Sequence, residues 1–308
     1  MEENVKTVED GEKNNAIAEC FSKGSLKNIT GMIMGTDVHD SDKVYALKKS
    51  FGRNLNTCVI GQTGRGKTED YAIPYVIQAV RAGHSVIVHD PTREAYCKTK
   101  QFIGSKGYEI KTISADELDI DIKGLGEKAF QPDNEYDDIY MAPGKKKCAY
   151  FITPSGNRTA KDILTWSLIR LMLYADCTKN RCLDVKTDLI LDDFCDMGFI
   201  EGIDSMLCVI RSRGICCHLI INSLEQLKNA YGEEEAYTLL NVCDTLVLTK
   251  TNDQSTAQFF SSQSGLDCKD VLNIGRWKSL IKFRTAPAII LDMVHYTDLL
   301  GAVAGKGR

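Results

Sequence analysis

Short apolar runs alternate with longer amphipathic segments along most of this chain. The runs have the length of buried strands, whereas the segments between them repeat apolar residues at helical spacing. Strands separated by helices in this way are typical of an α/β fold with a mostly parallel sheet and helices on both faces. The pattern predicts strands at residues 31–35, 43–47, 56–61, 84–90, 108–114, 147–154, 187–193, 215–222, 244–250, 278–284 and 287–293. It predicts helices at residues 67–83, 93–107, 158–175, 203–214, 224–232, 233–243 and 253–265.

Two segments depart from this pattern. Residues 1–29 begin with an acidic and polar stretch, and we expect them to form an N-terminal arm without regular structure. Residues 115–146 are acidic, contain glycines and prolines and show no period, so we expect a loop or a reduced insertion there. The rest of residues 30–308 is long enough to bury a core and is expected to form one domain.

Composition narrows the class of protein. Hydrophobic residues make up 43% and charged residues 26%, as in ordinary soluble globular proteins. The net charge of −4 creates no overall positive field, so any contact with DNA requires a local basic surface. The 12 cysteines include no C-x-x-C pair and favour a reducing cytoplasm over a disulfide scaffold. The chain shows neither a signal peptide nor an apolar run near the roughly 20 residues that span a bilayer.

The stretch GQTGRGKT, residues 61–68, matches the phosphate-binding pattern G-x-x-x-x-G-K-[ST]. It follows a predicted strand and precedes a predicted helix, which is the context that gives the pattern meaning. Backbone N–H groups at a helix N-terminus can surround phosphates, while the lysine reaches the β and γ oxygens and the threonine holds Mg²⁺. ATP and Mg²⁺ are therefore the expected cofactors. The candidate binding residues are Gly61, Thr63, Gly64, Arg65, Gly66, Lys67 and Thr68.

An acidic pair provides the second half of such a site. In the stretch DLILDDF, a predicted buried strand ends at Asp192 and Asp193. Asp192 can bind Mg²⁺ through water at the carboxyl edge of the sheet, and Asp193 can accept a proton from the attacking water. The alternative is that both carboxylates are a solvated strand end.

The order and spacing of several motifs resemble the TraG-like coupling ATPases of conjugation and type IV secretion. The resemblance runs from about residue 30 to about residue 295 and is carried by CVIGQTGRGKT, VIVHDPTREAY, DLILDDFCDMG, VIRSRGI and IINSLEQLKNAYG. It implies a RecA-like P-loop NTPase domain, related to hexameric DNA translocases, that couples ATP hydrolysis to the delivery of DNA or protein to a secretion channel.

The resemblance also implies roles for three further residues. Arg211 lies where the family has an arginine finger, which would act on the nucleotide of a neighbouring subunit in a hexameric ring, and Arg213 is its nearby rival. Both arginines can instead be surface charges that end a helix. Asn222 lies where the family usually has a glutamine that senses the phosphate, and its alternative role is to cap the helix that begins at Leu224. With Asp193, Arg211 and Asn222 form the expected catalytic set.

Three differences from the family are visible. Transmembrane helices usually precede the domain in the family, so we expect either a cytoplasmic protein or one held at the inner face of the membrane by partners or by a missing N-terminal region. The family's inserted helical domain is reduced here to residues 115–146, which puts substrate choice in doubt. The family's acidic pair is Asp-Glu, whereas this chain has Asp192 and Asp193, and the shorter carboxylate can slow hydrolysis.

The expected partners are DNA, relaxosome or secretion-channel proteins, and further copies of the chain. Lys145, Lys146 and Lys147 form a local basic cluster that can bind DNA or simply solubilise a turn. Two other functions remain open. One is a nucleotide-dependent docking platform with little hydrolysis, and the other is a P-loop kinase, which the lack of a recognisable lid and acceptor site disfavours.

Overall fold

A computed structural model describes residues 16–29, 31–48, 55–64, 66–114, 146–152 and 159–303. In these ranges the chain forms one sheet of 12 strands, in the order β1-β3-β2-β12-β11-β10-β4-β9-β8-β5-β7-β6. The strands are β1 (Phe21–Gly24), β2 (Ile33–Asp37), β3 (Asp40–Leu47), β4 (Thr57–Ile60), β5 (Ser85–His89), β6 (Glu109–Ser114), β7 (Lys147–Ile152), β8 (Thr187–Leu191), β9 (Ile215–Ile221), β10 (Thr245–Leu248), β11 (Lys278–Phe283) and β12 (Ile289–Asp292).

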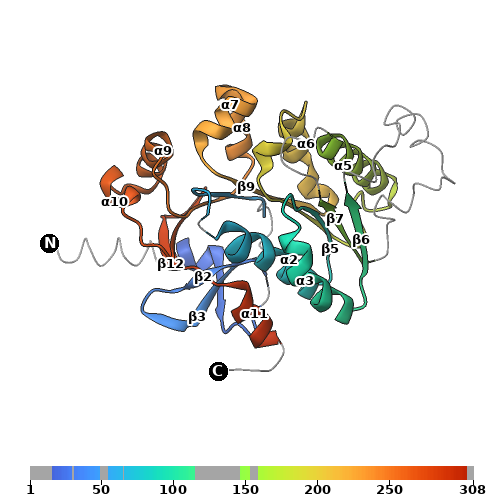
Figure 1. The fold of residues 1–308 in the computed structure, drawn as a ribbon, viewed down its shortest axis with the longest axis horizontal. Coiled ribbons are helices and arrows are strands. Elements are labelled where there is room, and N and C mark those ends of the chain that lie inside the picture. The colour runs from blue at the N-terminus through green and yellow to red at the C-terminus, as the bar shows by residue number, and fades with distance from the viewer. Residues whose placement is uncertain are drawn as a thin grey trace.

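Helices cover both faces of this sheet (Figure 1). One face carries α2, α3 and α11, and the other carries α5 to α10. The helical elements are η1 (Thr68–Ala72), α2 (Ile73–Arg81), α3 (Glu94–Ser105), α5 (Thr159–Cys177), η4 (Phe194–Met197), α6 (Ile203–Val209), η5 (Ile210–Arg213), α7 (Leu224–Tyr231), α8 (Glu233–Asn241), α9 (Gln254–Ser264), α10 (Cys268–Leu272) and α11 (Tyr296–Val303). None of the helices in the described ranges combines the length and the apolarity that a bilayer crossing requires.

The sheet has a parallel part and an antiparallel part. From β10 through β4, β9, β8, β5 and β7 to β6, every neighbouring pair of strands is parallel. From β10 through β11, β12, β2 and β3 to β1, every pair is antiparallel. The prediction of a mostly parallel sheet with helices on both faces is therefore confirmed.

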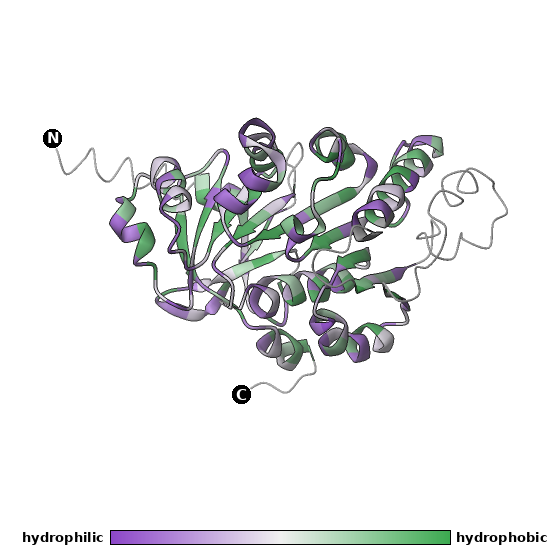
Figure 2. Ribbon diagram, turned by 45° about the horizontal axis from the view of Figure 1, so that its top comes forward, coloured by the Kyte–Doolittle hydropathy of each residue, from purple (hydrophilic) through white to green (hydrophobic). Residues whose placement is uncertain are grey.

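Strand alternation divides the interior into two hydrophobic cores. In β4, Cys58 and Ile60 point into the core under α5 to α10, whereas Val59 points into the core under α2, α3 and α11. All three side chains are fully buried, which explains why the parallel strands are continuous apolar runs rather than alternating ones. Figure 2 shows the same arrangement, with hydrophobic strands at the centre and hydrophilic residues on the outer sides of the helices. Burying one such side chain stabilises the fold by about 1.5–3 kcal/mol.

The structure describes part of one of the two segments that lacked a clear pattern, residues 1–29, and almost nothing of the other, residues 115–146. Part of the expected N-terminal arm belongs to the sheet, because β1 pairs with β3 in the register Phe21↔Leu47 to Gly24↔Val44. Phe21 also packs its ring edge-on against Tyr45 and Phe283, at 5.3 and 4.8 Å. Residues 1–15 and nearly all of the expected insertion, residues 115–145, lie outside the described residues.

Candidate nucleotide site at the carboxyl edge of the sheet

Three adjacent parallel strands deliver the candidate residues to one edge of the sheet. β4 leads into the phosphate loop (residues 61–68), β9 leads to Asn222, and β8 leads to Asp192. β9 lies between the other two strands, so the loop and Asp192 stand on either side of Asn222. The carboxyl ends of parallel strands are where ligands bind in open α/β sheets.

The phosphate loop is anchored to two neighbouring strands. The Gly61 N–H donates to the Ile221 carbonyl at 3.1 Å, and the Gln62 N–H donates to the Lys250 carbonyl at 2.9 Å. A Cβ at Gly61 would overlap the Thr249 hydroxyl, so the chain can pass this point only as glycine. Gly66 has a φ of 77° and a Cβ there would lie 2.5 Å from Asp70 Oδ2, which again excludes a side chain.

The tip of the loop is exposed and its end begins a helix. Thr63 and Gly64 are exposed at the loop tip, and Arg65 lies outside the described residues. Helical structure begins at Thr68 with a π-helical turn, η1, which continues into α2. Short π-helical turns are rare and are often found at functional sites.

Thr68 and Asp192 form the closest contact between the loop and β8. The Thr68 hydroxyl donates to Asp192 Oδ2 at 2.6 Å, and Asp192 Oδ1 accepts the Asp193 N–H at 3.2 Å. Burial raises the pKa of Asp192 to about 7, with a further contribution from the Asp193 charge, although the Thr68 hydrogen bond and the Lys67 charge oppose this shift. Mg²⁺ binds oxygen ligands, and the Asp192 carboxylate and the Thr68 hydroxyl supply two oxygens side by side. The positive charge around the buried Asp192 carboxylate is too small to offset its burial, so this pair fits a Mg²⁺ site.

Lys67 bridges the loop to Asn222. Its Nζ donates to Asn222 Oδ1 at 2.7 Å and to the Gln62 carbonyl at 3.4 Å. Asn222 Nδ2 in turn donates to Asp193 Oδ1 at 3.4 Å, so the amide lies between the lysine and the second aspartate. Burial lowers the pKa of Lys67, while the charges of Asp193 and Asp192 act in the opposite direction.

Asn222 is not the cap of the following helix. Ser223 is the N-cap of α7, and its hydroxyl accepts the Gln226 N–H at 3.1 Å. The Asn222 N–H donates to Gln226 Oε1 at 3.2 Å, which leaves the Asn222 side chain directed at Lys67 and Asp193.

Asp193 has a left-handed backbone conformation, with φ and ψ both at 48°. Aspartate and asparagine adopt this conformation more easily than most other residues, because their short polar side chains can hydrogen-bond locally. The chain turns sharply here into η4, and this turn directs the Asp193 carboxylate towards Asn222.

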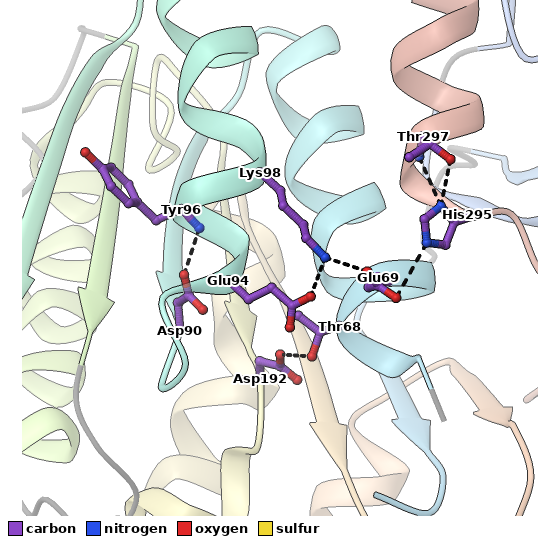
Figure 3. Close-up of polar contacts among 9 residues, drawn as sticks. All are labelled: Thr68, Glu69, Asp90, Glu94, Tyr96, Lys98, Asp192, His295 and Thr297. Atoms are coloured by element: carbon purple, nitrogen blue, oxygen red, sulfur yellow. Dashed lines mark hydrogen bonds and ion pairs between the residues drawn. The ribbon is translucent and has the colours of Figure 1, made fainter. Parts of the chain in front are cut away.

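A group of charged side chains beside Thr68 has no counterpart in the sequence-based site. Lys98 Nζ on α3 lies 2.5 Å from both Glu69 Oε1 and Glu94 Oε1, and His295 Nε2 lies 3.6 Å from Glu69 Oε2. Figure 3 shows that Glu69 and Glu94 approach Thr68 and Asp192 from η1 and α3. The only local sequence signal was the i,i+4 spacing of Glu94 and Lys98.

Asp90 is a second buried carboxylate at this edge, directly after β5. Its Oδ2 accepts the Tyr96 N–H at 2.8 Å (Figure 3), while its Oδ1 is buried without a hydrogen-bond partner in the described part of the chain. Burial raises the pKa of Asp90 against the backbone hydrogen bonds that it accepts from the start of α3.

The two candidate finger arginines lie at the opposite edge of the sheet. Both are in η5, which immediately precedes the amino end of β9, whereas the phosphate loop follows the carboxyl end of the neighbouring parallel strand β4. The seven residues of β9 separate the two edges by about 20 Å. Arg213 forms an ion pair with Asp176 of α5 at 2.8 Å, whereas Arg211 is exposed. Neither arginine is placed to reach the phosphate loop of its own chain.

The lysine cluster is divided by the fold. Lys147 begins β7, is buried and lies 3.5 Å from Glu109 Oε2, so it does not offer DNA an exposed charge. Lys146 is exposed at the amino edge of the sheet, and Lys145 lies outside the described residues.

One known protein family matches part of the chain. Residues 186–276, which include β8, η5 and Asn222, match the family described as "TraM recognition site of TraD and TraG". No curated protein sequence matches the chain significantly.

Solved structures establish the fold. The bacterial conjugative coupling protein TrwBdeltaN70 is 11% identical with a TM-score of 0.57, over 78% of this chain and 85% of that chain. The TrwB complex with the non-hydrolysable ATP analogue ADPNP is 12% identical, with the same TM-score and coverage. VirB4 of Thermoanaerobacter pseudethanolicus is 11% identical with a TM-score of 0.57, over 90% of this chain and 100% of that chain. The RecA-like P-loop fold and the resemblance to TraG-like coupling proteins are thus confirmed.

Proposed function

We propose that this chain is the ATP-hydrolysing motor of a conjugative DNA-transfer or type IV secretion apparatus. The observation that carries the proposal is the 2.6 Å hydrogen bond between Thr68 and Asp192, which joins the phosphate loop to the acidic strand end. The likeness to TrwB and VirB4 and the family match over residues 186–276 support the same function.

ATP and Mg²⁺ are the cofactors that these residues fit. TrwB has been solved with ADPNP and with ADP and Mg²⁺, and this chain has the same RecA-like fold. The loop N–H groups and Lys67 would hold the phosphates, while Thr68 and Asp192 would hold Mg²⁺. Bound Mg²⁺ neutralises charge on the phosphate oxygens and would supply the positive charge that buried Asp192 lacks.

Asp193, Asn222 and Arg211 have distinct roles in hydrolysis. Asp193 accepts a proton from the attacking water, and Asn222, which bonds both Lys67 and Asp193, orients the reacting groups. Arg211 acts in a neighbouring subunit, because its own phosphate loop lies at the other edge of the sheet. The active state is accordingly a ring of copies, which we take to be a hexamer as in the related translocases.

The family match supports a protein partner for this part of the chain. The family matched by residues 186–276 is described as the TraM recognition site of TraD and TraG, so we expect a relaxosome or secretion-channel protein to dock on this part of the chain. DNA is the expected transferred substrate, and the site of action is the cytoplasmic face of the membrane. The short carboxylate of Asp193 favours one alternative, a nucleotide-dependent docking platform with little hydrolysis.

Steady-state ATP turnover of the full chain, with and without single-stranded and double-stranded DNA, separates these functions. The motor predicts Mg²⁺-dependent turnover that DNA stimulates and that Lys67→Ala abolishes. ATP binding without turnover would establish the platform, and transfer of phosphate to a small acceptor would establish a kinase. Lys100→Ala, an exposed lysine on α3, is the matched control and should leave the rate unchanged.

A further inference from the structure

A basic pocket lies at the amino edge of the sheet, on the side away from the phosphate loop. Its volume is about 420 Å³. The lining residues come from the turn after β1, the C-terminal ends of α2, α3 and α11, and the segments that lead into β6 and β7. They are Lys27, Val80, Arg81, Gly83, Lys106, Tyr108, Lys146, Ala302 and Val303.

The charge of this pocket has a single sign. Its lining has four cationic side chains, Lys27, Arg81, Lys106 and Lys146, and none of the described residues that line it is acidic. These residues are far apart in the sequence, so the fold itself brings the four charges together against their mutual repulsion. In a protein with a net charge of −4, this concentration of positive charge is local.

Arg81 has a structural role in the wall of the pocket. The Arg81 guanidinium donates to the carbonyls of Leu26 and Lys27, at 3.2 and 2.9 Å, and so ties α2 to the turn after β1. Within the described ranges, no hydrogen bond or ion pair holds the ammonium groups of Lys27, Lys106 and Lys146; Lys106 only lies over the Phe102 ring, at 5.7 Å. Among the described residues, their donors are not engaged by other groups.

The rest of the lining is partly apolar and includes one tyrosine. Tyr108 is fixed because its hydroxyl donates to the carbonyls of Val80 and His84, at 3.2 and 2.9 Å. Gly83 has a φ of 78°, a conformation that favours glycine, and it lies beside Lys146, whose Nζ would be 3.4 Å from a Cβ at this position. Val80, Ala302 and Val303 add aliphatic surface. The pocket therefore offers several ammonium donors around a partly apolar wall.

We propose that this pocket binds a ligand with two or more phosphate charges, at a site separate from the phosphate loop. Lysine ammonium groups are general phosphate binders, and an anion held by three of them relieves the repulsion in the empty pocket. The limited size of the pocket suits a discrete phosphorylated group better than a nucleic-acid backbone, which needs an extended basic track. The same chemistry is present in a soluble pyrophosphate compound and in an anionic lipid headgroup.

Pyrophosphate titration of the full chain tests this proposal. All variants carry Lys67→Ala, so that any remaining binding at the phosphate loop is common to them. Saturable binding should weaken about tenfold or more when Lys106→Gln and Lys146→Gln are combined, because two charged donors are lost. The matched control combines Lys100→Gln with Lys179→Gln, which removes the same charge from exposed lysines outside the pocket and should change binding less than about twofold.

Vesicles identify the source of the phosphate. Phosphatidylcholine vesicles with and without phosphatidic acid are sedimented with the same variants. Lysine-dependent binding to the acidic vesicles, competed by pyrophosphate, identifies a lipid headgroup, whereas pyrophosphate binding without vesicle binding identifies a soluble ligand. The proposal is overturned if pyrophosphate binding does not saturate, or if the pocket variant and the control variant weaken pyrophosphate binding equally. It is also overturned if the pocket lysines affect only the binding of an oligonucleotide.

Discussion

The Thr68 hydroxyl donates to Asp192 Oδ2 at 2.6 Å, so that the phosphate loop and the end of β8 are joined across the intervening strand β9. If this pair holds Mg²⁺, Thr68→Ala should weaken Mg²⁺-dependent binding of a non-hydrolysable ATP analogue by about tenfold or more. Thr68→Ser keeps the hydroxyl and should restore most of the affinity. Titrations of the ATP analogue at several Mg²⁺ concentrations measure the affinities of both variants. If the Mg²⁺ dependence of Thr68→Ala is unchanged, Thr68 is not part of the metal site.

Asp193 should control hydrolysis rather than binding. Asp193→Asn keeps the left-handed backbone but cannot accept a proton, so it should bind ATP and turn over about 10²- to 10⁴-fold more slowly. Asp193→Glu restores the longer side chain of the family's acidic pair and should retain or raise the rate. Single-turnover hydrolysis with bound ATP separates the two steps. An asparagine variant as fast as the parent would show that another group activates the water.

Asp188 should make the fold sensitive to acid. This buried carboxylate on β8 lies 2.6 Å from His84 Nδ1 and 3.4 Å from His218 Nε2. Burial raises its pKa, but the hydrogen bonds and charges of His218 and His84 outweigh burial and lower the pKa from 3.8 to about 2. Because the folded-state pKa is the lower one, the stabilisation is present above about pH 4 and is lost as the pH falls towards 2.

Urea unfolding at several pH values tests this assignment. Asp188→Asn should reduce the free energy of unfolding at pH 7 by about 2–3 kcal/mol, because the lowering of the Asp188 pKa from 3.8 to about 2 corresponds to roughly that much stabilisation. The difference between parent and variant should shrink below pH 4. Asp184→Asn, an exposed aspartate just before β8, should have little effect at any pH. A difference that does not change with pH would mean that Asp188 acts through packing alone.

The parallel part of the fold could be predicted because its signals are local. Most strands of the parallel part are short apolar runs next to a helical segment, whereas the edge strand β6, EIKTIS, mixes apolar and polar residues. The phosphate loop lies between the apolar run of β4 and the helical segment that follows it. β1 was missed because the stretch FSKG has only one large apolar residue, and its pairing partner β3 is about 20 residues away. The short helices α10 and α11 were missed as well.

In the candidate site, too, the local motifs could be predicted from the sequence and the non-local contacts could not. The loop and the acidic strand end are contiguous motifs, so their meeting at one edge followed from parallel topology. The contacts of Glu69 with Lys98 and His295 join η1, α3 and the segment before α11, and no periodicity in the sequence reveals such a non-local arrangement. The role of Asn222 needed the structure, because only the observed cap at Ser223 excludes the capping alternative.

The family resemblance favours Arg211 over Arg213 as the finger, and the structure places the two arginines in different surroundings. Arg213 is occupied by Asp176, so Arg213→Ala should cost at most about 1 kcal/mol of stability and little activity. Arg211→Ala should lower ATP turnover by about 10³- to 10⁵-fold if it acts as the finger. Turnover of the two variants at equal protein concentration compares them directly. The opposite ranking would transfer the finger role to Arg213.

The central claim is that this chain is a motor whose nucleotide site is completed by a neighbouring subunit. The most direct measurement mixes Lys67→Ala subunits, which retain Arg211, with Arg211→Ala subunits, which retain an intact phosphate loop, and records ATP turnover. Each variant alone should be inactive, and the mixture should recover part of the parent rate, because some interfaces pair an intact loop with an intact Arg211. If mixed assemblies form, as verified by differently tagged subunits, and no activity returns, the shared site and the motor built on it are contradicted.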